Sequence, residues 1–342
     1  MPFMADRGRQ ANAVFVPSLI GSSGETLREA FGQALTSVAA AYPSLVVLDA
    51  DVAGGTGLHH FRRAYPDRFV QLGIAEQNML GVAAGLALAG RLPVASTFAV
   101  FALRTVEQVR QSIAYPRLNV KLAASHPGLD AGPDGASAQA LEDLAVFRAI
   151  PGMTVVSPAD AVEMAKAVPA ILDYDGPVYL RTGRSPARRI LDDSYVFELG
   201  RGRVVRDGGD VTIVACGVEV ARALDAADLL VRDGISARVV NMSTIKPIDE
   251  ALVVACARET GAFVTAEDHN VVGGLGGAVA ETLARTTPAP IEFIGVRDVF
   301  GESGEPEELA EKYGLTGPSI ADAARRAIAR KRGGPSGPHA QS

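Results

Sequence analysis

The sequence predicts an α/β protein of two domains, each with a mainly parallel sheet covered by helices. Apolar strand-like runs alternate with helix-periodic segments along nearly the whole chain. The chain has 342 residues, 48% of them hydrophobic, which is enough for two buried cores. This alternation stops at residues 186–210, where arginine, proline and glycine replace the periodic pattern. We therefore expect domains at 22–185 and 211–331, joined by a linker at 186–210.

Composition excludes several classes of protein. A net charge of −6, without basic runs interleaved with aromatics, argues against nucleic-acid binding. The longest apolar stretch, 79–89, is too short to span a bilayer. Pro17 interrupts the apolar part of residues 1–21, so we expect a flexible leader rather than a signal peptide, and a disordered tail at 332–342. A cytoplasmic protein is the expectation.

The first domain is predicted as strands and helices in alternation. Strands are expected at 45–48, 69–72, 92–97, 119–124, 153–156 and 178–181. Helices are expected at 24–41, 76–90, 101–113, 141–149 and 159–172. The strands are apolar throughout, which is typical of a parallel sheet buried on both faces. The glycine-rich turn 54–57 follows the first strand, where parallel sheets deliver their ligand-binding loops.

The second domain repeats the alternation. Strands are expected at 211–216, 237–241, 262–266 and 291–294, and helices at 218–231, 249–259, 275–286 and 319–330. The glycine run 273–277 lacks the spacing of a dinucleotide-binding fingerprint and favours a tight, closely packed turn. The preceding segment 267–269, Glu-Asp-His, could be a proton relay, but a satisfied loop cluster or a subunit contact is the preferred interpretation. Cys216 and Cys256 lie in apolar runs and are interpreted as small core residues.

Glu76 is the first candidate for chemistry. It stands between a strand and the apolar segment 80–90. An acid in so apolar a setting loses solvation, which favours the neutral form that can donate a proton. The alternative is an ordinary acid in the first turn of a helix, stabilised by the helix dipole. The loop 126–137 is a second candidate, because it is too long and polar for a simple connector.

Several of these segments resemble one family. The sequence Gly-Ile-Ala-Glu-Gln-Asn at 73–78, Ser-Thr-Phe at 96–98 with Phe101, and Gly-Pro-Asp-Gly at 132–135 are similar to the pyrimidine-binding part of transketolase. Residues 267–269, 273–277 and 301–304 resemble the C-terminal domain of that family. The resemblance covers most of the chain. It implies a thiamine diphosphate enzyme that transfers a two-carbon ketol unit from a ketose phosphate to an aldehyde.

The resemblance implies a role for each cofactor-binding position. Glu76 would hydrogen-bond the ring nitrogen of the aminopyrimidine, which promotes the imino form that removes the thiazolium proton. Phe98 and Phe101 would hold the pyrimidine by stacking, although two core aromatics are the plainer interpretation. Asp51 matches an acidic loop position next to the cofactor.

Substrate binding is implied at four further positions. Arg28, His126 and Arg181 match the phosphate-binding set, where guanidinium groups grip phosphate and a neighbouring histidine can be held protonated. Taken singly, Arg28 would be a helix-surface charge and Arg181 a strand-end charge. Asp134 matches an aspartate that contacts a donor hydroxyl. Four residues later the family usually has histidine, and this chain has Ala138, which cannot transfer a proton. Either the substrate differs, another group such as Ser137 substitutes, or ordinary ketose phosphates turn over poorly.

One part of a complete enzyme is missing from the sequence. The Gly-Asp-Gly and Asn-Asn pattern that marks the diphosphate and metal site does not occur. We assign no metal ligands to this chain. The resemblance implies a split enzyme, with Mg²⁺ or Ca²⁺ held by an N-terminal transketolase subunit in an α2β2 heterotetramer.

Four alternatives remain open at this point. The first is a specialised biosynthetic relative with another donor or acceptor, which Ala138 favours. Deoxyxylulose phosphate synthase is disfavoured because its chain normally includes the other thiamine domain. The β subunit of a 2-oxo acid dehydrogenase usually carries paired histidines in the 132–138 region. A non-catalytic scaffold would leave the whole set of matched residues unexplained.

Overall fold

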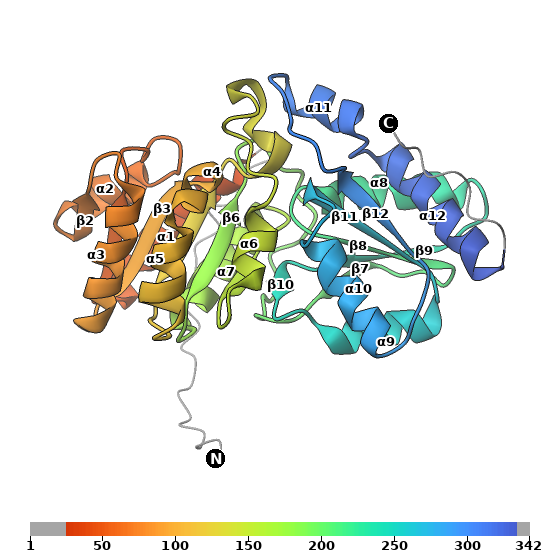
Figure 1. Ribbon diagram of the computed structural model, residues 1–342, viewed down its shortest axis with the longest axis horizontal. Helices are drawn as coiled ribbons and strands as arrows, with labels where there is room; N and C mark the ends of the chain where they lie inside the picture. The colour runs from red at the N-terminus through yellow and green to blue at the C-terminus, as the bar shows by residue number, and fades with distance from the viewer. Residues whose placement is uncertain (1–24, 334–342) are drawn as a thin grey trace, which may run out of the picture.

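The computed structural model describes residues 25–333, which form two sheets side by side (Figure 1). The first sheet has seven strands in the order β10-β5-β6-β4-β3-β1-β2. Its strands are β1 (Leu45–Asp49), β2 (Phe69–Gln71), β3 (Leu92–Phe98), β4 (Lys121–Ser125), β5 (Thr154–Val156), β6 (Val178–Thr182) and β10 (Thr244–Lys246). Strands β1 to β6 are parallel, as predicted, whereas β10 comes from the second half of the chain and pairs antiparallel with β5.

The register of this sheet brings the carboxyl ends of its strands into line. Asp49 at the end of β1 pairs with Gln71 of β2 and with Ser96 of β3. One step further along, Phe98 pairs with Ser125 of β4. Because parallel strands all point the same way, the loops that follow them leave from one edge of the sheet.

Helices cover both faces of the first sheet. They are α1 (Leu27–Val38), α2 (His59–Ala64), α3 (Glu76–Leu88), α6 (Asp143–Ala149) and α7 (Ala161–Asp173). Helix α1 begins where the hydroxyl of Thr26 caps it by accepting a hydrogen bond from the Glu29 backbone N–H at 3.3 Å. Its apolar face, with Phe31 and Leu35 fully buried, packs with α7 on one side of the sheet.

The prediction of one continuous helix at 101–113 is wrong. The chain instead forms short pieces of different pitch: α4 (Ala99–Ala102), a 3-10 turn (Leu103–Thr105), α5 (Val106–Gln108) and a π-helical turn (Val109–Ala114). The buried hydroxyl of Thr105 donates to the Ala102 carbonyl at 2.7 Å. Such a local bond competes with the regular helical ladder.

The second sheet has five strands in the order β12-β11-β8-β9-β7. They are β7 (Arg203–Arg206), β8 (Val211–Ala215), β9 (Ala237–Asn241), β11 (Phe263–Asn270) and β12 (Ile291–Val296). Its helices are α8 (Glu219–Val231), α9 (Glu250–Glu259), α10 (Leu275–Arg285), α11 (Pro306–Tyr313) and α12 (Gly317–Lys331). Strand β7 lies inside the predicted linker, so that part of the linker belongs to the second sheet, antiparallel to β9. Its short Arg-Val-Val-Arg sequence carries little strand signal.

One hydrophobic core crosses the boundary between the two halves. Leu144 and Met153 from the first half share it with Val253 and Leu275 from the second. Both cysteines are buried and unpaired, as expected. Among residues 25–333, no helix has the length and apolar character needed to cross a membrane. The predicted leader and residues 334–342 of the predicted tail lie outside the described residues.

Candidate active site

Five loops that leave the carboxyl edge of the first sheet form the candidate site. They follow β1, β2, β3, β4 and β6, and each begins at or just after the end of its strand. Asp51, in the loop after β1, is exposed and adopts a left-handed backbone with φ of 65°. Its N–H donates to Gln71 Oε1 at 3.1 Å, and Gln71 Nε2 in turn donates to Asp49 at 2.7 Å. These bonds hold the first two loops together.

Glu76 is the first residue of α3 and is 6% exposed. The preceding residue, Ala75, offers no side-chain cap. No hydrogen bond or ion pair from another residue in 25–333 engages the Glu76 carboxyl. Its place in the first turn suits the helix dipole. Although the residue is largely buried, its carboxylate oxygens are not among the buried polar atoms that lack a partner, so a ligand or another chain can reach them.

Phe98 and Phe101 form a parallel stack. Their ring centroids lie 5.4 Å apart and their planes differ by 6°. The other neighbour of Phe98 is His126, at 3.9 Å between centroids. Both phenylalanines are partly exposed and lie outside the buried core clusters, so the core-aromatic interpretation is wrong. Gly55 fits here because a Cβ at this position would lie 2.6 Å from the Phe98 ring.

Arg28 and His126 meet around the backbone of Gly55. Arg28 Nη1 donates to the Gly55 carbonyl at 3.4 Å, and Ser125 Oγ donates to the same oxygen at 3.1 Å. Ser125 Oγ also lies 2.8 Å from His126 Nδ1. The Nε–H of Arg28 is buried and has no partner within residues 25–333. This donor is available to an anion that enters the loop cluster.

Arg181 does not join this cluster. It lies within β6 rather than after it, and it is 4% exposed. Its Nε donates to Asp143 at 2.8 Å, a second bond runs from Nη2 to the same carboxylate, and Nη1 donates to the Asp268 carbonyl at 3.0 Å. The prediction of Arg181 as a phosphate-binding residue is therefore wrong, because its donors are committed inside the core.

Arg184, just beyond the end of β6, contacts the loop after β4 instead. Its Nη1 lies 3.6 Å from Asp134 and donates to the Ala131 carbonyl. The positive charges of Arg28 and Arg184 both act on His126. Arg184 is not among the site residues predicted from the sequence, although its position just past the predicted strand at 178–181 is a usable signal.

His126 is neutral at pH 7 in the free chain. Burial, followed by the charges of Arg28 and Arg184, lowers its pKa to about 4, against a smaller opposing effect of Asp134. The expectation that His126 is held protonated is therefore wrong for the unliganded protein. A bound anion would oppose both guanidinium charges and favour protonation.

Residues 267–269, Glu-Asp-His, lie within strand β11 and not in a loop as preferred, but their side chains are hydrogen-bonded. Glu267 accepts from the backbone N–H groups of Leu275 and Gly276 at 2.7 and 2.8 Å, where the predicted tight glycine turn starts α10. Asp268 accepts from the Leu129 N–H at 2.9 Å, and so links the second half of the chain to the loop after β4. These bonds leave no support for a proton relay.

A second link joins the two halves at the loop that carries Asp134 and Ala138. Gln139 Nε2 donates to the Glu302 carbonyl at 2.8 Å, and a Cβ at Gly135 would lie 2.5 Å from Ser303 Oγ. Residues 301–304 therefore fix the loop that carries Asp134 and Ala138.

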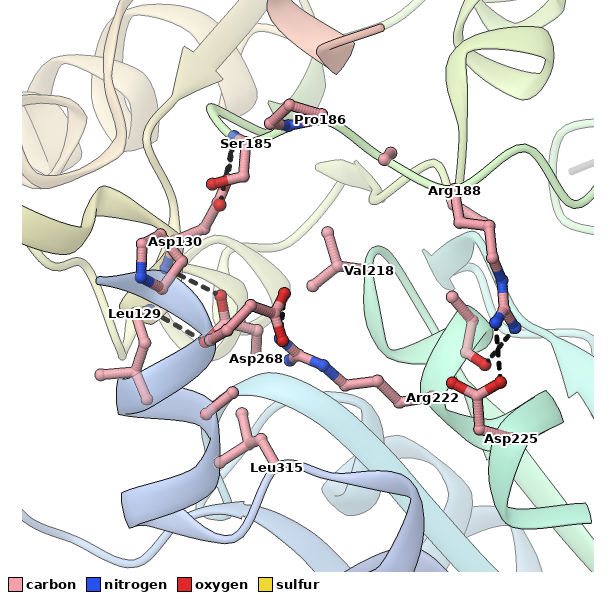
Figure 2. Close-up of a pocket in the computed structure, with 16 residues that line it drawn as sticks. Leu129, Asp130, Ser185, Pro186, Arg188, Val218, Arg222, Asp225, Asp268 and Leu315 are labelled. Carbon is pink, nitrogen blue, oxygen red and sulfur yellow. Dashed lines mark hydrogen bonds and ion pairs between the residues drawn. The ribbon is translucent and has the colours of Figure 1, made fainter. Parts of the chain in front are cut away.

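A cavity of about 220 Å³ lies between the two halves (Figure 2). Its walls are the loop after β4, the start of the linker, α8 and α11. Two arginines face it, and each has acidic partners: Arg188 bonds Asp225 at 2.7 Å, and Arg222 pairs with Glu219 and Glu307. No predicted site residue lines this cavity, so it is not the candidate site.

Comparison with known proteins decides the family. Residues 24–189 match the transketolase pyrimidine-binding domain, and residues 200–320 match the transketolase C-terminal domain. The chain belongs to the transketolase family. It is a subunit of a transketolase-like transferase.

Several relatives are named as one section or one subunit of a transketolase. A putative transketolase C-terminal section of Methanocaldococcus jannaschii is 46% identical over 299 residues, which are 86% of this chain and 94% of that protein. The 6-deoxy-6-sulfo-D-fructose transketolase subunit SqwH of Clostridium sp. is 45% identical, with 89% and 95% covered. A solved structure described as a split gene transketolase, inactive β4 tetramer, has 51% identity and a TM-score of 0.85, with 90% and 100% covered.

Membership of the transketolase family implies thiamine diphosphate as the cofactor. The residues present suit its pyrimidine end. The Glu76 carboxyl has no partner in the described chain and can be reached by a ligand, and Phe98 with Phe101 presents parallel aromatic faces. The sequence offers no matching site for a diphosphate and its cation.

Proposed function

We propose that this chain is the C-terminal subunit of a two-component transketolase that moves a two-carbon ketol unit from a ketose phosphate to an aldehyde. The observation that carries the proposal is the shared carboxyl edge of the first sheet, from which the segments that carry Glu76, the Phe98–Phe101 stack and His126 all leave, with Arg28 beside the Gly55 loop. Bound thiamine diphosphate would supply the carbanion chemistry. Glu76 would hold a proton between its carboxyl and the pyrimidine nitrogen.

The substrate phosphate would bind at the cationic cluster. Arg28 has a buried N–H without a partner in residues 25–333, and the positive charge of Arg184 acts on His126. His126 would gain a proton when the anion enters. Guanidinium groups bind phosphate oxygens in a fixed, two-pronged geometry. Asp134, exposed and 3.6 Å from Arg184, would orient a donor hydroxyl.

The partner would cover the exposed face of α3, the helix whose first residue is Glu76. Ile74 and Leu88, at the two ends of this face, are 79% and 75% exposed. Gly81 and Gly85 between them are exposed and have open space at their Cβ positions. A helix that is apolar around much of its circumference is normally covered. An N-terminal subunit seated here would bring the diphosphate site and Mg²⁺ or Ca²⁺ to Glu76, in an α2β2 assembly within the cytoplasm.

A second candidate is a specialised transketolase with a modified donor or acceptor. Ala138 favours it, because a methyl group stands where the family usually has a proton-transferring histidine. The 45% identical relative named as a sulfofructose transketolase subunit supports the idea that split subunits serve modified ketoses.

The test is a reconstituted pair of subunits. With xylulose 5-phosphate beside unphosphorylated ketoses, Glu76→Gln is expected to lower kcat at least 100-fold without preventing assembly. Glu107→Gln, an exposed acid on α5, is the matched control. Activity within twofold of the unmodified pair for Glu76→Gln would defeat the catalytic assignment.

A further inference from the structure

Two histidines and a glutamate converge between α1 and α2, outside the residues that form the candidate active site. His60 Nε2 lies 2.8 Å from Glu29 Oε2, and His59 Nε2 lies 3.8 Å from the same oxygen. All three potential ligand atoms lie within 4.8 Å of one another. Each side chain is about one-third exposed, so solutes can reach the group.

The arrangement of the two histidines is unusual for neighbours on a helix. Successive residues of an α-helix point about 100° apart, since each turn has about 3.6 residues. The rings of His59 and His60 nevertheless stand 4.1 Å apart between centroids, and both Nε2 atoms are directed toward Glu29. Both side chains have therefore turned to the same side of α2.

A histidine–glutamate pair explains only half of this geometry. The 2.8 Å contact accounts for His60 as a hydrogen-bond partner of Glu29. His59 gains no such bond, because 3.8 Å exceeds hydrogen-bonding distance. Its other nitrogen, Nδ1, is buried and has no partner within residues 25–333. His59 is thus placed for a contact that the protein alone does not make.

We propose that Glu29, His59 and His60 form a binding site for a divalent transition cation of the Zn²⁺ class. Two imidazole nitrogens with one carboxylate oxygen suit Zn²⁺, Co²⁺ or Ni²⁺, whereas Mg²⁺ and Ca²⁺ prefer oxygen ligands. Tetrahedral bonds of about 2.0–2.1 Å separate ligand atoms by roughly 3.3 Å. The observed 2.8 and 3.8 Å separations lie on either side of that value. The fourth position would be open to water.

The position of this site gives the cation a structural effect. Glu29 follows Arg28 on α1, and the segment between the two helices contains Gly55, whose carbonyl accepts from Arg28 and Ser125. A cation bound to both helices would fasten the ends of this segment. We therefore expect metal binding to stabilise the fold and to hold the Gly55 loop in place.

Calorimetric titration of the untagged chain with Zn²⁺ tests the proposal. We expect one site per chain with micromolar affinity and a rise in Tm, and no displacement of Zn²⁺ by millimolar Mg²⁺. His59→Asn should weaken binding at least tenfold while leaving Tm without metal unchanged, because the His59 ring makes no hydrogen bond within residues 25–333. Glu29→Gln should weaken it similarly. His339→Ala, at a histidine outside the described residues, is the control and should bind as the unmodified chain does.

Cobalt gives an independent readout of the ligands. Bound Co²⁺ should show the intense visible absorption of a tetrahedral site, and His60→Asn should abolish it even where that variant is less stable. The absence of Zn²⁺ binding at millimolar concentration would overturn the proposal. So would unchanged affinity and an unchanged Co²⁺ spectrum in the doubly substituted His59→Asn, His60→Asn chain.

Discussion

Arg181 and Asp143 form a two-pronged ion pair that is sealed inside the protein. Both side chains are almost completely buried, and the guanidinium also reaches the Asp268 carbonyl in the second half of the chain. Arg181→Gln is expected to destabilise the lone chain by about 3–5 kcal/mol, because it leaves a buried carboxylate without its counter-charge. Chemical denaturation measures this loss. A change below about 1 kcal/mol would contradict the structural role.

Substitution of Arg184, three residues later, should change substrate binding and leave the stability of the chain nearly unchanged. In the reconstituted enzyme, Arg184→Gln is expected to raise the KM for a ketose phosphate roughly 10–100-fold, since a charge-assisted contact contributes about 1.5–3 kcal/mol. The KM for an unphosphorylated ketose and the stability of the chain should change little. Equal effects on both substrates would remove Arg184 from the phosphate site. Arg189→Gln, at an arginine paired with Asp193 on the surface, is the control.

The pH behaviour of His126 offers a direct view of this cluster. Its pKa of about 4 in the free chain lies below the usual value near 6.5, so the unfolded chain binds more protons between these values. The contribution of His126 to stability is therefore complete above pH 6.5 and is lost as the pH falls toward 4. An NMR titration should show the low pKa, raised by added sulfate. Arg184→Gln should raise it in the free chain, and a pKa unmoved by sulfate would contradict anion binding here.

Ala138 tests the choice between ordinary and specialised substrates. Ala138→His restores a proton-transferring group in the half-buried loop between Gly135 and Gln139. If the natural substrate is specialised, kcat with xylulose 5-phosphate should rise by about 10²-fold, which is at the lower end for general acid–base catalysis. Ala136→His, two residues earlier, is the control. No change in donor preference would count against this account of position 138.

We predict that the N-terminal subunit binds to the exposed face of α3. Gly85→Leu adds a side chain into open space in the lone chain and replaces the poorest helix-forming residue apart from proline, so Tm should be unchanged or higher. The same bulk should block the close approach of another subunit and lower reconstituted activity at least tenfold. Analytical ultracentrifugation of the mixed subunits measures assembly. Normal assembly would place the partner elsewhere.

The length and burial of an element decide whether it can be predicted from the sequence. Parallel strands such as β3 and β4 are buried along almost their whole length and mostly apolar, and the predicted bounds agree with the structure to within two residues. Strands β7 and β10 pair at sheet edges over three or four residues, too few to show a period. The sequence predicts Arg181 and does not single out Arg184, because the end of a strand cannot be located to within a few residues from the pattern alone. The Glu29–His59–His60 group was missed because α1 and α2 meet only in the fold.

The central claim is that Glu76 belongs to half of a cofactor site that another subunit completes. Calorimetry of thiamine diphosphate with Mg²⁺, using this chain alone and then the mixed subunits, tests it most directly. We predict no measurable binding by the chain alone and micromolar or tighter binding by the pair. Tight, Mg²⁺-dependent binding by the chain alone would contradict the claim.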